Sequence, residues 1–184
     1  QGVKMDGEIL CPFFFEGGRY TLADTHYVRS GEELIPAAKT EFARDATFGY
    51  AHSNLREYIE EKTGGACRAS EVVSISIEEL RRCDIDAVTA KLCAAQDYTR
   101  FVVNAASYAD VKLFAAAVSR ALAAGKRFIF RTAASLVREL GGVSARPLLT
   151  RGELMADGRG NGGVIVVGSH TEKTTRQLQE LRKL

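Results

Sequence analysis

The chain has 184 residues, of which 46% are hydrophobic and 26% charged, a balance typical of a globular protein that buries a core. Its net charge of +2 gives no electrostatic reason to expect a nucleic acid or an acidic membrane as a partner. The longest apolar runs are far shorter than the roughly 20 residues of a membrane-spanning helix, and no leader-like segment opens the chain. We therefore expect a cytoplasmic protein.

The first third of the chain is predicted to be rich in strands. "EILCPFFF" (8–15) predicts a short buried strand, and "GGRYT" (17–21) predicts a turn back into extended chain. "THYVRSGEELIPAA" (25–38) predicts a hairpin whose turn lies at Ser30-Gly31. The next stretch, "KTEFARDATFGYAHS" (39–53), is mixed, and its aromatic residues indicate a packed loop.

From Ser53 onward the pattern alternates between helices and strands. Ser53 or Asn54 is predicted to cap a helix in "LREYIEEKTGG" (55–65), which the two final glycines end. "EVVSIS" (71–76) predicts a strand. Ser76 with Glu three residues later forms a capping-box pattern, which predicts a helix through about Ala95.

The same alternation continues to residue 140. "RFVVNA" (100–105) and "RFIFRT" (127–132) predict strands, Gly125 ends a helix between them, and "AASLVREL" (133–140) predicts a further helix. The helix before Gly125 places these residues on one face: Val111, Phe114, Ala115, Val118 and Leu122. This order predicts an α/β fold with a mostly parallel sheet flanked by helices.

The predicted domain organisation changes near residue 143. Residues 1–143 are interpreted as most of an N-terminal α/β domain whose start is missing, and the glycine-rich residues 144–162 as an interdomain linker. Residues 163–184 restart a strand and a helix, as the beginning of a second α/β domain. Because the chain begins with Gln and ends inside a helical pattern, we interpret it as a piece of a longer protein.

A candidate phosphate site lies in the turn Gly168-Ser169-His170-Thr171. The turn joins a predicted strand to a helix, and a helix N-terminus offers free N–H groups and partial positive charge. Gly168 permits close approach of the backbone, while Ser169 and Thr171 provide hydroxyl groups. The alternative is that Ser or Thr only caps the helix, and the turn lacks the pattern of a P-loop.

Two further candidates lie in the first third. Arg19 follows Gly17-Gly18, and an arginine on such a turn can hold a carboxylate with two hydrogen bonds, or can simply be a surface arginine. Arg44-Asp45 precedes the aromatic stretch 48–50, so the charged pair either lines a pocket or anchors a long loop.

Polar residues also follow two predicted parallel strands. Asn104 and Arg131-Thr132 stand at strand ends, the favoured position for ligands in open α/β folds and also for ordinary helix caps. The four cysteines are Cys11, Cys67, Cys83 and Cys93. They form no CxxC pair, and no histidine stands at metal-ligand spacing from them, so we expect free thiols and no metal site.

Five segments in order make the chain resemble the four-carbon acid sugar kinases, which include threonate, erythronate and 3-oxo-tetronate kinases. The segments are "GGRYTLADTHYV", "TEFARDATFGYAHSNLREYIEEKTGG", "VVNAASYADV", "RFIFRTAASLV" and "GGVIVVGSHTEKTTRQL". The resemblance implies an N-terminal domain that binds the acid sugar and a C-terminal domain that binds ATP with Mg²⁺. It places Gly168-Ser169 at ATP and implies that catalytic residues lie upstream of Gln1.

The resemblance thus predicts a fragment of an ATP-dependent kinase, inactive alone, whose parent phosphorylates a hydroxyl of a small sugar acid. Arg19, Arg44 and Asp45 are its predicted substrate-binding residues. The alternative is a non-catalytic binding module or a type III effector-like protein that acts through partner recognition. Val164, Val166 and Leu178 would need a partner, so we also expect self-association as a homo-oligomer.

Overall fold

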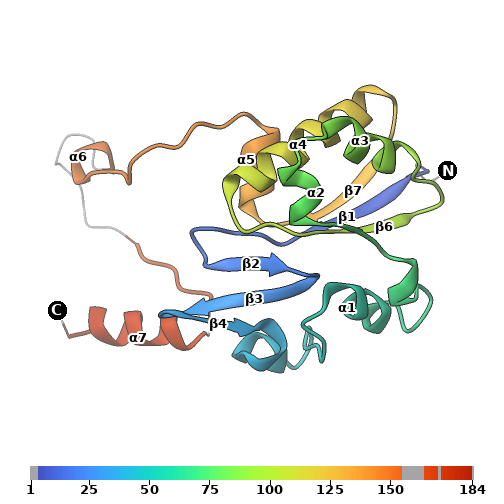
Figure 1. Cartoon of the computed structure of the whole chain (residues 1–184). Coiled ribbons are helices and arrows are strands. Elements are labelled where there is room, and N and C mark those ends of the chain that lie inside the picture. Colours follow the sequence, from blue (N-terminus) through green and yellow to red (C-terminus); the bar gives the residue numbers. More distant parts are fainter. Residues whose placement is uncertain (1–3, 155–163, 170, 184) are drawn as a thin grey trace. The chain divides into compact units, whose positions relative to one another are not determined.

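A four-stranded parallel sheet forms the centre of the first unit in the computed structural model, which describes residues 4–154, 164–169 and 171–183 (Figure 1). Contacts divide the chain into two units, Gln1–Ser144 and Ala145–Leu184. The strand order is β5-β6-β1-β7. The bounds are β1 (Gly7–Cys11), β5 (Val73–Ile75), β6 (Thr99–Val103) and β7 (Phe128–Thr132). The predicted α/β fold is confirmed.

The two central strands are buried on both faces. Ile9 and Cys11 of β1 belong to one core cluster, while Leu10 between them belongs to the other. This alternation follows from the two-residue period of a strand. In Figure 1, one face of the sheet is covered by α2 (Ile77–Arg81), α3 (Ile85–Cys93), α4 (Tyr108–Ala123) and α5 (Ala134–Leu140). On the other face lie α1 (Leu55–Lys62) and the strands β2 (Arg19–Leu22) and β3 (Thr25–Ser30). Apolar residues therefore follow one another in these strands, rather than standing at every second position, because other elements pack against both faces of the sheet.

Helices α1 to α4 begin where a polar side chain caps them, whereas α5 follows Ala133 and has no side-chain cap. Asn54 accepts hydrogen bonds from two backbone N–H groups of α1, and Ser76 and Glu79 form the predicted capping box. On α4 the predicted apolar face is buried except for Leu122, which is 40% exposed.

The prediction of one continuous helix from Ser76 to about Ala95 is wrong. α2 ends after Arg81, because Cys83 takes a left-handed backbone conformation with φ of 59°. Asp84 then starts α3 by accepting a hydrogen bond from the N–H of Ala87 at 2.9 Å. An aspartate that caps a helix start competes with continuation of the preceding helix.

A second, antiparallel sheet is formed by β2 (Arg19–Leu22), β3 (Thr25–Ser30) and β4 (Glu33–Pro36). The predicted hairpin is confirmed, since Ser30 pairs with Glu33 and Gly31 has φ of 63°. The sequence interpretation did not identify the β2–β3 pair. Short 3-10 helices lie at η1 (Ala37–Lys39), η2 (Glu41–Arg44) and η3 (Ala69–Glu71).

A polar clasp ties the β2–β3 turn to the parallel sheet. Ala23 and Asp24 both have positive φ, 45° and 61°, a conformation that costs L-residues roughly 1 kcal/mol each. Asn104, 1% exposed at the end of β6, accepts from the N–H of Asp24 and donates to its Oδ1, both at 2.7 Å. Ser74 donates to the same oxygen at 2.5 Å. The clasp therefore holds a strained turn at the carboxyl edge of the strands.

The second unit contains α6 (Arg151–Leu154) and α7 (Glu172–Leu181). A helix was expected in the latter position, but the strand expected before it is not formed. Residues 164–169 have no strand partner among the described residues, and Val164 and Val166 are 90% and 89% exposed. A strand needs a neighbour to satisfy its backbone groups, so apolar β-branched sequence alone does not produce one. None of the described helices has the length and apolarity needed to cross a membrane.

The clasp predicts a large effect of Asn104→Ala on stability. The substitution leaves buried partners of Asn104 without hydrogen bonds and frees the strained turn, so we expect the free energy of unfolding to fall by about 3 kcal/mol. Asn54→Ala, which removes only a helix cap, should cost about 1 kcal/mol. Urea unfolding of both variants measures this. Equal losses would contradict the structural importance of the clasp.

Candidate functional site

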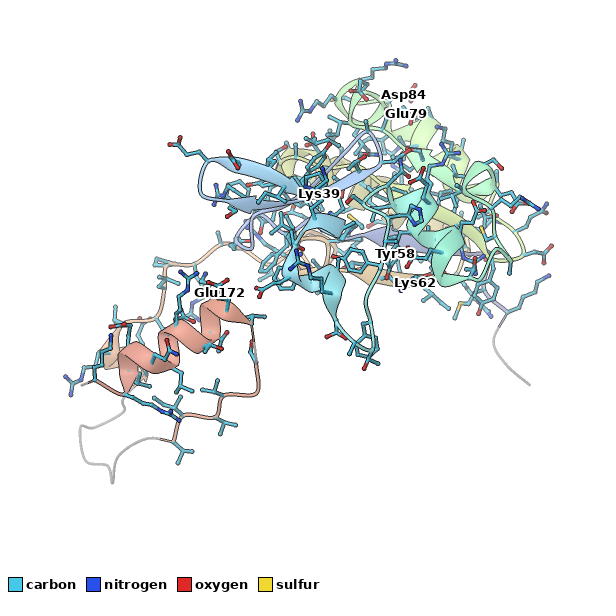
Figure 2. The ribbon with its side chains drawn as sticks, turned by 90° about the horizontal axis from the view of Figure 1, so that it is seen from below. Lys39, Tyr58, Lys62, Glu79, Asp84 and Glu172 are labelled. Atoms are coloured by element: carbon cyan, nitrogen blue, oxygen red, sulfur yellow. The ribbon has the colours of Figure 1, made fainter. Side chains whose placement is uncertain are left out.

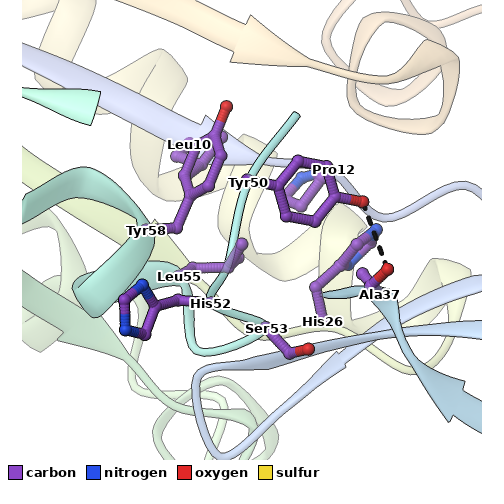
Figure 3. A pocket seen from close by; sticks show the side chains of 9 residues that line it. All are labelled: Leu10, Pro12, His26, Ala37, Tyr50, His52, Ser53, Leu55 and Tyr58. Atoms are coloured by element: carbon purple, nitrogen blue, oxygen red, sulfur yellow. Dashed lines mark hydrogen bonds between the residues drawn. The ribbon is translucent and has the colours of Figure 1, made fainter. Parts of the chain in front are cut away.

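A pocket of about 160 Å³ lies between the end of β1, β3, the loop before α1, and α1 itself (Figure 3). We call it the Tyr50 pocket. Its volume suits a small molecule rather than a single water molecule. It is lined by Leu10, Pro12, His26, Ala37, Tyr50, His52, Ser53, Leu55 and Tyr58.

The walls of the Tyr50 pocket combine apolar side chains with a few polar tips. The rings of Tyr50 and Tyr58 meet edge to face with centroids 5.6 Å apart. The Tyr50 hydroxyl donates to the carbonyl oxygen of Ala37 at 3.4 Å, and burial raises its pKa, so the phenol stays protonated. Ser53 Oγ accepts from the N–H of Ala38 at 2.9 Å. Such a lining of carbon surface and convergent polar groups is typical of small-molecule sites.

His26 contributes a neutral imidazole to the pocket. Its Nδ1 lies 3.1 Å from Oγ1 of Thr21, which is fully buried and paired through its backbone with Ala105 at the end of β6. Burial, together with the positive charge of Arg19, lowers the pKa of His26 to about 4. At neutral pH the ring therefore offers hydrogen bonds without a charge.

Arg19 supplies the positive charge beside this pocket. Its guanidinium carbon lies 4.6 Å from the centroid of the Phe42 ring, and the side chain is half-buried. Its charge acts on both His26 and Tyr50, which line the pocket. Within the described ranges no carboxylate forms an ion pair with Arg19. A half-buried guanidinium with no carboxylate partner is suited to bind an anion.

Arg44 and Asp45 lie in the same loop but do not line the Tyr50 pocket. Arg44 ends η2 and is exposed. Asp45 Oδ1 accepts from the N–H groups of Thr47 and Phe48, both at 2.8 Å. The carboxylate thus shapes a turn, which favours the loop-anchoring interpretation, and a role of this pair in substrate binding stays a prediction.

The predicted phosphate site belongs to the second unit. Ser169 Oγ lies 3.2 Å from Thr171 Oγ1, which lies 3.1 Å from Thr174 Oγ1. Thr171 precedes α7 and makes no side-chain cap hydrogen bond to it. Gly168 has open space around it, whereas His170 lies outside the described residues. The hydroxyl groups therefore gather at a helix N-terminus, and nucleotide binding there stays a prediction.

Sequence reasoning missed Asp24 as the clasp and His26 as a pocket residue. Asp24 also lines a second cavity of about 460 Å³ with Ser74 and Asn104. The signal that could have found His26 is a two-residue turn that sets Thr21 opposite it in a hairpin. Among the residues that the structure describes, no three His, Cys, Asp or Glu side chains gather to hold a metal ion.

The depressed pKa of His26 predicts a specific pH dependence. Between pH 6.5 and 4 the unfolded chain binds a proton at His26 that the folded chain does not, so folding becomes less favourable as the pH falls. Between pH 7 and 5 the free energy of unfolding should drop by about 2 kcal/mol from this residue. The drop should be absent in His26→Asn, measured by urea unfolding at both pH values. The same drop in both proteins would show that His26 is not the cause.

Comparison with known proteins identifies the family. A family model described as "Sugar-binding N-terminal domain" matches residues 1–140. No match is found among curated proteins. The fold is similar to that of a Haemophilus influenzae DUF1537 protein, with 17% identity and a TM-score of 0.52, over 73% of this chain and 29% of that chain. It is also similar to a Bordetella bronchiseptica DUF1537 protein, with 22% identity, a TM-score of 0.51, and coverage of 73% and 28%.

The solved structures and the family model match different shares of the proteins compared. The chain spans less than a third of the length of the two solved structures, and at these identities the likeness concerns the fold. The family model, by contrast, matches most of the chain, including every strand of both sheets. The chain belongs to the family described as the sugar-binding N-terminal domain.

Proposed function

We propose that this chain is the acid-sugar-binding part of an ATP-dependent kinase that phosphorylates a hydroxyl of a small four-carbon sugar acid. The observation that carries the proposal is Arg19, half-buried beside the Tyr50 pocket and without a carboxylate partner among the described residues. A sugar acid brings the anion that this guanidinium lacks and hydroxyl groups for the polar tips around it.

In this proposal the carboxylate of the ligand pairs with the guanidinium fork of Arg19. The neutral ring of His26 and the hydroxyl groups of Tyr50 and Ser53 hydrogen-bond the hydroxyl groups of the ligand. Leu55 supports its carbon chain. Because His26 carries no charge at neutral pH, Arg19 provides the electrostatic selection for an acid over the corresponding neutral polyol.

Phosphoryl transfer needs groups that this chain contributes only in part. The hydroxyl groups of Ser169 and Thr171, before the N-terminus of α7, fit phosphate oxygens, so we assign them to ATP. ATP supplies the phosphoryl group, and Mg²⁺ binds chiefly through its phosphates. The chain also spans less than a third of the length of the two solved structures that it matches. We therefore propose that the chain alone binds the acid but does not phosphorylate it.

The relatives offer two kinds of support. The Bordetella bronchiseptica protein is described with bound citrate, another small carboxylic acid, and as a domain-swapped dimer. We propose by analogy that this chain binds a small carboxylate and self-associates. The comparisons give no support to the alternative of a non-catalytic, effector-like module.

Binding of four-carbon acids by the isolated chain tests the proposal at Arg19. Arg19→Lys keeps the charge but loses the fork, so its affinity for erythronate or threonate should fall by about 1.5 kcal/mol, or roughly tenfold. Arg19→Met, which also removes the charge, should lose more affinity for these acids. Isothermal titration calorimetry measures both. Arg82→Lys, an exposed arginine on the opposite covering of the sheet, is the control and should bind like the unaltered chain.

Normal affinity in both Arg19 variants would remove this residue from the site. Erythritol, which has the hydroxyl groups without the carboxylate, should bind far more weakly than erythronate to the unaltered chain. Equal binding of the two would contradict selection by charge.

The nucleotide assignment is tested in the full-length parent. Ser169→Ala removes a hydrogen bond to a charged phosphate, so ATP affinity should fall by about 1.5–3 kcal/mol while affinity for the acid is unchanged. Ser119→Ala, whose hydroxyl only bonds within α4, is the control. If ATP binds Ser169→Ala normally and turnover is normal, the serine serves only the local turn.

A further inference from the structure

One carboxylate on α1 holds the loop that forms a wall of the Tyr50 pocket. Glu61 Oε2 accepts from the backbone N–H of Ala51 and from Nδ1 of His52, both at 2.9 Å. The neighbouring Lys62 donates to the carbonyl oxygen of Gly49 and lies 3.4 Å from Glu61 Oε1. The last turn of α1 thus binds three residues of one short segment, 49–52.

This segment has little else to hold its middle. Ala51 and His52 are exposed, so burial contributes little to their position. Tyr50 and Ser53, on either side, are fixed by hydrogen bonds to Ala43 and Ala38. The polar contacts with Glu61 therefore decide whether the segment lies against α1.

Gly49 allows the segment to turn tightly before it reaches α1. A Cβ atom at Gly49 would lie 2.5 Å from the carbonyl oxygen of Asp45 and 2.9 Å from that of Ala43. The backbone packs closely here, and its carbonyl is the one that Lys62 binds. The segment is thus built to approach the helix at one defined place.

The opposite wall is fixed independently. The hydroxyl oxygen of Tyr58 on α1 accepts a hydrogen bond from the guanidinium of Arg131 on β7 at 3.2 Å, and this guanidinium lies 5.7 Å from the Tyr58 ring centroid. Figure 2 shows Tyr58 and Lys62 close together on α1, and Lys62 Nζ lies 5.8 Å from the same ring. The helix is therefore the anchored side, and Glu61 holds Ala51 and His52 of the loop against it.

We propose that Glu61 is a positioning residue for the ligand pocket: its carboxylate latches Ala51 and His52 to α1 and so keeps His52, which lines the Tyr50 pocket, in the wall around the sugar acid. This inference rests on the proposed function. It assigns to Glu61 an effect on ligand affinity without contact between Glu61 and the ligand.

The ionisation of Glu61 agrees with this role. Burial alone would raise its pKa, but hydrogen bonds from His52 and Ala51, together with Lys62, outweigh burial and hold the pKa at about 2. The carboxylate is therefore ionised at neutral pH, and one oxygen can accept two hydrogen bonds strongly.

Glu61→Gln tests the latch, with Glu57→Gln as the matched control. Both substitutions remove one negative charge from α1, but Glu57 is exposed and does not line the Tyr50 pocket. We expect hydrogen exchange of residues 49–53 to accelerate at least about tenfold in Glu61→Gln. Affinity for erythronate should fall about three- to tenfold, because the binding-competent state is less populated. Urea unfolding, which reports the whole unit, should hardly change.

The outcomes separate the latch from the proposed function. Unchanged exchange in residues 49–53, or unchanged affinity in a variant that exchanges faster, would overturn the latch. Equal effects of Glu57→Gln would do the same, because they would reflect helix charge alone. The proposed function is judged on the unaltered chain: failure to bind any four-carbon acid there overturns it, while faster exchange confined to Glu61→Gln still supports the latch.

Discussion

Burial of both faces of the parallel sheet is the constraint on which the rest of the first unit depends. Strands such as β1 place apolar side chains on both sides, so each face needs its own covering. Helices α2 to α5 provide one covering, and α1 with the antiparallel sheet provides the other. The Tyr50 pocket lies on the second of these faces, where the hairpin, the loop before α1 and α1 itself leave a cavity over the end of β1.

The second covering is joined to the sheet by polar contacts at the strand ends. Asn104 fixes the β2–β3 turn through Asp24, and Thr21 extends the same hairpin along Ala105. These contacts place His26 in the pocket wall and Arg19 at its side. The hairpin thus contributes a neutral imidazole to the pocket and a guanidinium beside it.

The pocket loop is held in a different way from the core. Tyr50 is partly buried, but Ala51 and His52 depend on the carboxylate of Glu61. Hydrogen bonds at an exposed position break at lower free energy than core packing, so this wall can open without unfolding of the sheet.

The sequence by itself determined the elements whose signals are local. Apolar runs predicted the parallel strands, Asn54 and Ser76 marked helix starts, and the glycines before Arg19 marked a turn. The tertiary structure alone decided which distant residues meet, because His26 and Tyr50 come together only when the hairpin and loop pack over β1. It also decided that residues 164–169 form no strand, since a strand depends on a neighbour that local sequence cannot supply.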